Sequence, residues 1–134
     1  KNAETFEGVY ATVGLHPENV DEYTGDFNYI YELAKSSKVV AIGEIGLDYH
    51  YDNSVEHKAK QKELFIKQIE IANELDLPVV IHSRDADMDM LEILKNHKIE
   101  NGFVMHCFSS SVEILKEVPT HQGICSSEFA GCHR

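Results

Sequence analysis

The stretch that most constrains the fold runs from Val39 to Asp48, with the sequence VVAIGEIGLD. It is rich in β-branched residues, too short for a free-standing helix and broken by two glycines, so it predicts a buried parallel strand. Glu44 lies in this run among apolar neighbours. Because an ionised carboxylate in such surroundings needs compensation, we expect Glu44 to pair with a cation, bind a metal or have a raised pKa. A structural carboxylate bonded to turn amides is the alternative.

Three further apolar runs share one property with this stretch: each is followed by polar side chains at its end. Strands that alternate with helices predict a parallel sheet, and the carboxyl ends of its strands lie at one edge. The sequence therefore predicts an α/β fold with the polar residues in one shared crevice. The runs are Val9–Leu15 before His16-Pro17, Pro78–Ile81 before His82–Asp85, and Gly102–Met105 before His106.

Between these runs, apolar residues recur at helical spacing and predict amphipathic helices. The most regular pattern contains Phe65, Ile69 and Ala72, and a later one contains Met88 and Leu91. Residues that favour helix N-termini precede each pattern. The predicted caps are Asp26, Asn53 with Glu56, Asp85, and Ser110 with Glu113.

Length and charge limit the classes of function. The 134 residues, 43% of them hydrophobic, predict one domain over residues 1–134. No apolar run is long enough to span a membrane and no leader opens the chain, so we expect a cytoplasmic protein without membrane contact. The net charge of −11 repels a polyanion, so phosphate chemistry would require a divalent metal. Three cysteines without C-x-x-C spacing predict reduced thiols.

Glu44, His82 and His106 end successive predicted strands, so their side chains can converge on one ion. Imidazole nitrogen and carboxylate oxygen suit zinc, manganese or iron, and such an ion activates water as a nucleophile. Hydrogen-bonded core histidines are the alternative for His82 and His106. Arg84 is a candidate to grip a phosphate, or else it pairs with a neighbouring aspartate on the surface.

Four segments in order resemble the TatD family of metal-dependent deoxyribonucleases, within the amidohydrolase superfamily. The resemblance implies a TIM (β/α)8 barrel, one or two divalent ions (Mg, Mn or Zn) at its carboxyl face, and hydrolysis of DNA, often as an exonuclease. It implies Glu44, His82 and His106 as metal ligands, with Glu44 bridging, and it places His16 in the pocket where substrate or water is positioned. The alternative for His16 is that it only fixes the turn before Pro17. Glu44 and His16 would be the catalytic residues. The segments are Gly14–Pro17, Gly43–Asp48, Ile81–Ala86 and His106–Ser109.

The sequence departs from the family pattern in ways that affect the expected function. It lacks the His-x-His pair of the family's first strand and the aspartate of its eighth, so we expect strands three to six, with a seventh near Gly123–Ser126. Residues 119–134 no longer resemble the family and are predicted to be foreign sequence. Exposed barrel edges predict either self-association, with one copy completing another, or marginal stability and aggregation. Alternative functions are an inert metal-binding fragment, or another amidohydrolase acting on a cyclic amide or ester.

Overall fold

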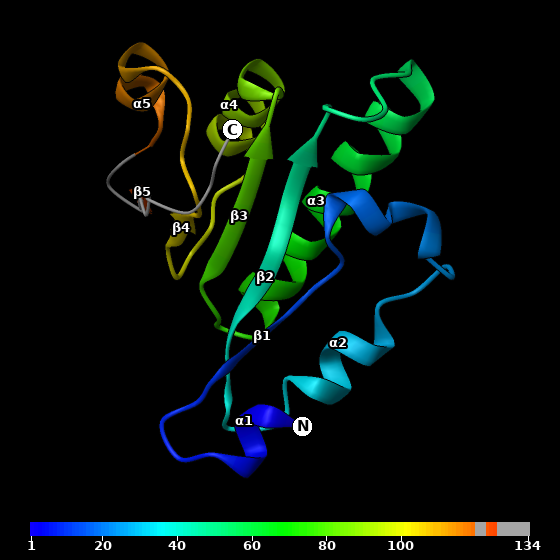
Figure 1. Cartoon of the computed structure of the whole chain (residues 1–134), viewed down its shortest axis with the longest axis vertical. Helices are drawn as coiled ribbons and strands as arrows, with labels where there is room; N and C mark the ends of the chain where they lie inside the picture. Colours follow the sequence, from blue (N-terminus) through cyan, green and yellow to red (C-terminus); the bar gives the residue numbers. More distant parts are fainter. Residues whose placement is uncertain (120–122, 126–134) are drawn as a thin grey trace.

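The structure is a computed structural model that describes residues 1–119 and 123–125. Its sheet contains parallel strands in the order β1-β2-β3-β4-β5, with helices between them (Figure 1). This arrangement confirms the predicted α/β fold and is that of part of a TIM barrel. The strands are β1 (Ala11–Val13), β2 (Val39–Asp48), β3 (Val79–Arg84), β4 (Phe103–Met105) and β5 (Gly123–Cys125).

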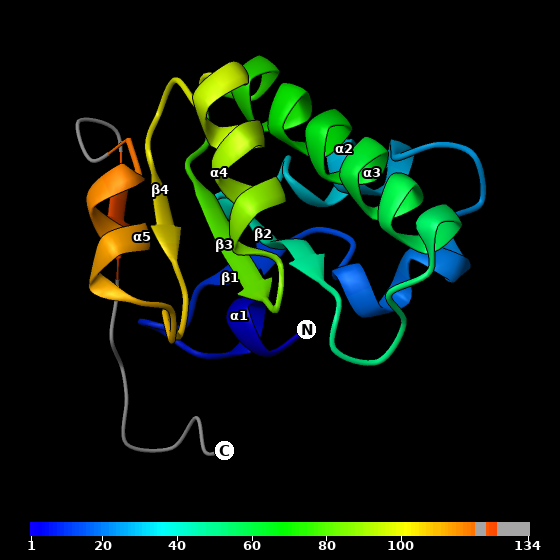
Figure 2. The same ribbon diagram turned by 90° about the horizontal axis from the view of Figure 1, so that it is seen from above.

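Apart from α1 (Asn2–Thr5), which precedes β1, the helices lie on the connections between the parallel strands. Helices α3 and α4 cover the same face of the sheet (Figure 2). The long α3 packs mainly against β2, and α4 packs against β3. The helices are α1 (Asn2–Thr5), the 3-10 helix η1 (Pro17–Glu22), α2 (Asn28–Leu33), α3 (Val55–Glu74), α4 (Asp87–Asn96) and α5 (Val112–Glu117).

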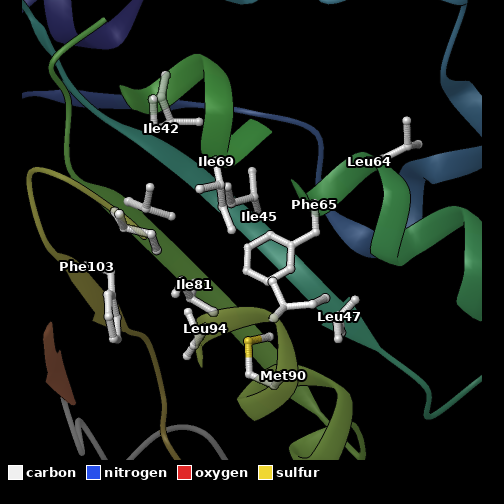
Figure 3. Close-up of a cluster of buried hydrophobic side chains, with 14 of the residues drawn as sticks. Ile42, Ile45, Leu47, Leu64, Phe65, Ile69, Ile81, Met90, Leu94 and Phe103 are labelled. Atoms are coloured by element: carbon white, nitrogen blue, oxygen red, sulfur yellow. The ribbon is translucent and has the colours of Figure 1, made fainter. Parts of the chain in front are cut away.

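The hydrophobic core fills the space between the sheet and these helices (Figure 3). Phe65 and Ile69 of α3 are buried there, as their spacing predicted. Met88 was predicted to face the core, but it is 74% exposed, and Met90 occupies the buried position instead. The buried face of α4 consists of Met90, Leu91, Ile93 and Leu94, and Met88 lies outside it.

Two of the predicted helix caps are wrong by one residue. Ser54, rather than Asn53, caps α3, and Ser111, rather than Ser110, caps α5. Each serine hydroxyl accepts a hydrogen bond of 3.3 Å from the backbone N–H three residues on. The helices themselves form where their apolar patterns predicted them.

The two aspartates predicted as caps differ in outcome. Asp26 accepts a hydrogen bond of 2.9 Å from the N–H of Asn28, so it satisfies a donor at the start of α2. Asp85 caps nothing, because α4 starts after Ala86 without a side-chain cap. The φ of Asp85 is +53°, and its carboxylate lies 2.9 Å from Nδ1 of His50. The strand before it is also longer than predicted, since β3 continues to Arg84.

Several further expectations can be compared with the described residues only in part. The predicted seventh strand is present as β5, whereas Ser126 lies outside the described residues, as do His133, Arg134 and most of the 119–134 tail. Cys107 is disulfide-bonded, so the prediction of reduced thiols is wrong for this residue. None of the helices over residues 1–119 combines the length and apolar character needed to cross a bilayer. The single-domain assignment stays a prediction.

Candidate metal centre

Glu44 meets two histidines at the carboxyl edge of the sheet. Its Oε1 lies 3.3 Å from Nδ1 of His82 and 3.2 Å from Nδ1 of His106. Glu44 comes from β2, His82 from β3, and His106 directly follows β4. Neighbouring parallel strands thus bring Glu44 together with His82, which is 38 residues away in the sequence, and with His106, which is 62 residues away. The structure places these three predicted residues together, and their role as ligands stays a prediction.

Gly46 allows β2 and β3 to approach closely enough for this contact. It is the pairing partner of His82 in the sheet, and its φ is +143°. A Cβ at this position would collide with the carbonyl oxygen of His82. Because alternate residues of a strand share a face, Glu44 and Asp48 lie on either side of Gly46, and the His82 ring fits between the two carboxylates.

The charges at this edge stabilise one another. The hydrogen bond from His82 lowers the pKa of Glu44, and the contact with His106 acts in the same direction. Burial disfavours the charged form of His82, but hydrogen bonds to Glu44 and Asp48 outweigh burial and raise its pKa. The side chains of Glu44 and His82 are only 28% and 22% exposed, so solvent screens these interactions incompletely. Of the alternatives for Glu44, cation pairing fits the structure and a raised pKa is wrong.

His16, which follows β1, also lies next to Glu44 and His82. Its ring lies edge-on to that of His82, with centroids 4.6 Å apart. Potential ligand atoms of His16, Glu44 and His82 all lie within 4.8 Å of one another. His106 contacts Glu44 but falls outside this compact group, and its side chain is more exposed.

The hydrogen bonding of His16 distinguishes it from the other histidines. It caps η1, and its Nδ1 accepts a hydrogen bond of 3.2 Å from the N–H of Glu18. In the neutral ring the proton must then be on Nε2, which makes this nitrogen a donor rather than a metal ligand. Burial, with the charge of His82, lowers the pKa of His16 and favours that neutral form.

Arg84 lies two residues beyond His82 on the same strand, so both side chains share one face of β3. Its guanidinium lies over the exposed ring of Tyr51, with Cζ 5.4 Å from the centroid. Within the described part of the chain, no ion pair joins Arg84 to Asp85 or Asp87. The alternative of a surface ion pair for Arg84 is therefore not found among the described residues, and its role toward phosphate stays a prediction.

Sequence reasoning missed the part that Asp48 takes in this site. The Oδ1 of Asp48 accepts a hydrogen bond of 3.0 Å from the backbone N–H of His50. Its Oδ2, however, lies 2.7 Å from Nε2 of His82. The available signal was the even spacing of Glu44, Gly46 and Asp48, which places both carboxylates on one face of the strand.

Two buried glutamines of α3, seven residues apart, were also missed. Gln61 accepts the N–H of Asp48 and donates to its carbonyl oxygen, both at 2.8 Å. Gln68 makes the same pair of bonds with Leu15, at 2.6 and 3.2 Å. Gln61 thereby fixes the end of β2, and Gln68 fixes the residue before His16. Polar residues at positions of α3 that otherwise face the core were the signal for them.

The donors at this edge fit a divalent cation. Carboxylate oxygen and imidazole nitrogen together suit zinc or manganese, and the carboxylate supplies the negative charge that the ion requires. Glu44, His82 and His106 could hold such an ion, with His16 beside it. The candidate ligands among the described residues are few enough to leave coordination positions for water and substrate.

Comparison with known proteins identifies a family model and several similar proteins. The family model described as "TatD related DNase" matches residues 1–130. The chain is 47% identical over 116 residues to the uncharacterized metal-dependent hydrolase YabD of Bacillus subtilis, covering 85% of this chain and 45% of that protein. It is 36% identical over 118 residues to the 3'-5' ssDNA/RNA exonuclease TatD of Cronobacter sakazakii, covering 86% and 44%.

A solved structure shares the fold. The crystal structure of YJJV, a TatD homolog from Escherichia coli, superposes with a TM-score of 0.78 at 30% identity, covering 92% of this chain and 48% of that one. The chain thus spans about half the length of the relatives that it matches. The match to the family model covers nearly all of the sequence. The chain therefore belongs to the TatD related DNase family.

Proposed function

We propose that this chain carries the central metal-binding part of a divalent-metal-dependent hydrolase that cleaves phosphodiester bonds in DNA. The observation that carries the proposal is the position of Glu44 Oε1 within 3.3 Å of the Nδ1 atoms of both His82 and His106. The relative named as a 3'-5' ssDNA/RNA exonuclease supports a single-stranded nucleic acid as substrate. The cytoplasmic location stays a prediction.

In this proposal, Glu44, His82 and His106 would hold one or two divalent ions of magnesium, manganese or zinc. When bound, such ions supply Lewis-acid polarisation of the phosphoryl group and activation of water. They also reverse the local field of a chain whose net charge of −11 would otherwise repel DNA.

His16 and Arg84 position the substrate. His16, whose ring lies against that of His82, donates a hydrogen bond from its Nε2–H to a phosphate oxygen or to the attacking water. Arg84 binds the neighbouring phosphate through its guanidinium, which can offer two parallel N–H donors. The exposed Tyr51 ring beneath Arg84 provides a surface on which a base can stack.

The test is nucleotide release from a single-stranded oligonucleotide labelled at one end, with Mn²⁺ or Mg²⁺ added. Glu44→Ala should abolish release and weaken Mn²⁺ binding measured by titration calorimetry. Glu70→Ala removes an exposed glutamate of α3 and should change neither quantity. Release that persists in Glu44→Ala would contradict the proposed centre.

A second candidate is a catalytically inert metal-binding fragment. The specific observation in its favour is that the chain spans only about half the length of its relatives. The same experiment separates the two candidates. Mn²⁺ uptake that depends on Glu44, without nucleotide release, supports the inert fragment, whereas absence of Mn²⁺ uptake would contradict both.

A further inference from the structure

We propose that Asp48 is a positioning residue that fixes the Nε2–H tautomer of His82 and so leaves the Nδ1 lone pair, beside Glu44, available to a divalent ion. The inference rests on the proposed function in one respect, since it takes His82 to be a metal ligand. Asp48 itself does not contact the ion. It acts through the imidazole that lies between the two carboxylates.

The two contacts of the His82 ring are not equivalent. Nε2 lies 2.7 Å from Asp48 Oδ2, whereas Nδ1 lies 3.3 Å from Glu44 Oε1. An ionised carboxylate can only accept a hydrogen bond, so a neutral ring places its single proton at one of these nitrogens. The shorter contact, with a carboxylate that is only 3% exposed, selects Nε2.

Asp48 is held too firmly to adapt to the other tautomer. Its backbone N–H and carbonyl oxygen are both bonded to Gln61, which is 1% exposed. Its second carboxylate oxygen accepts the N–H of His50. Both oxygens of Asp48 therefore face N–H donors, one from the backbone and one from the His82 ring.

This arrangement makes Asp48→Asn a discriminating substitution. Asparagine has nearly the same shape but carries one acceptor oxygen and one NH₂ group. If the oxygen stays on the N–H of His50, the NH₂ group faces His82 Nε2 and forces the ring proton onto Nδ1. That tautomer has no lone pair where the ion would bind. If the amide turns round, the NH₂ group instead opposes the N–H of His50.

The primary measurement is the tautomer of His82, read from imidazole ¹⁵N shifts of the metal-free chain at alkaline pH. We expect the Nε2–H form in the unmodified protein and the Nδ1–H form, or a mixture, in Asp48→Asn. We also expect Mn²⁺ affinity, measured by calorimetry, to fall about 10- to 100-fold in the variant, the range typical for partners of metal-binding histidines.

Asp89→Asn is the matched control. Asp89 also accepts a hydrogen bond of 2.7 Å, from the Tyr49 hydroxyl, and its loss changes the net charge equally. It should leave both the His82 tautomer and Mn²⁺ affinity unchanged. Rescue by Asp48→Glu, which restores an acceptor but not its position, should be partial.

The Nδ1–H form in the unmodified chain would overturn the inference even if Asp48→Asn fails to fold. Mn²⁺ affinity equal to that of the unmodified chain in a folded Asp48→Asn variant would overturn it as well. Because the tautomer is measured without metal or DNA, failure of nucleotide release would refute the nuclease proposal while leaving the role of Asp48 standing.

Discussion

Replacement of Gln61 by methionine should destabilise the protein far more than the loss of a single surface hydrogen bond would. Methionine has a similar length and shape but no hydrogen-bonding groups, so the substitution removes both bonds to the backbone of Asp48. With Asp48 3% exposed and Gln61 1% exposed, water cannot replace them. The N–H and the carbonyl oxygen of Asp48 are then both left unsatisfied.

The magnitude follows from the cost of such groups. Each unsatisfied buried donor or acceptor costs about 1–3 kcal/mol, so the pair costs about 2–6 kcal/mol. Burying a thioether in place of an amide offsets part of this cost, since the amide no longer has to be desolvated. We expect the free energy of unfolding to fall by about 2–4 kcal/mol, a large part of the stability of an ordinary domain.

Urea unfolding followed by circular dichroism measures this loss, with an unchanged m-value as the sign that the unfolded state is not altered. Glu70→Gln and Glu70→Met provide the matched control, because they compare the same two side chains at an exposed position of α3. These two should differ by only a few tenths of a kcal/mol, given similar helix propensities. A loss below about 0.5 kcal/mol for Gln61→Met, relative to that pair, would refute the reasoning.

Three further outcomes are expected. Gly46→Ala should lower the free energy of unfolding by about 3 kcal/mol or more, because strain at a φ of +143° adds to the collision with His82. Gly8→Ala, with a φ of +79° in open space, should show only the cost of the strain. Urea unfolding compares the two variants, and equal losses of stability would contradict the collision. Because the pKa of His82 is raised, Mn²⁺ affinity should fall as pH drops through a value above the ordinary 6.5. In the metal-free chain, the pairing of His82 stabilises the fold below pH 6.5, and this stabilisation is lost as pH rises through the raised pKa. Calorimetry of Mn²⁺ binding and urea midpoints across this pH range test both signs, and a pH-independent response would be inconsistent with them. Edge strands β1 and β5 of the described sheet should promote self-association, and a monomer in sedimentation velocity over a wide concentration range would count against this.

The repeating order of strands and helices was determined by the sequence alone. Apolar runs such as Val39–Asp48 and the face containing Phe65 and Ile69 repeat at the periods of strand and helix, and burial in a core requires those periods. The polar residue at the end of each run also follows from local sequence. Together these patterns predict that Glu44, His82 and His106 share one edge of a parallel sheet.

Local details close to helix ends were harder to predict from the sequence. Asn53 and Ser54 are both good caps, and the choice between them depends on where the preceding loop enters α3. Asp85 looks like a cap in the sequence, but β3 continues past His82. The carboxylate of Asp85 bonds to His50 instead of capping α4. Contacts of this kind come from a neighbouring connection and leave no mark in the local pattern.

Only the tertiary structure determined how the site is held. Asp48 orients His82, Gln61 fixes the end of β2, and Gln68 fixes the residue before His16. His16 in turn directs its Nδ1 toward the N–H of Glu18. Hydrogen bonds are directional and short, so which donor meets which acceptor depends on strand register and helix placement to within about an ångström. Periodicity fixes which face a side chain lies on, but the partner it meets there is decided only when the elements pack.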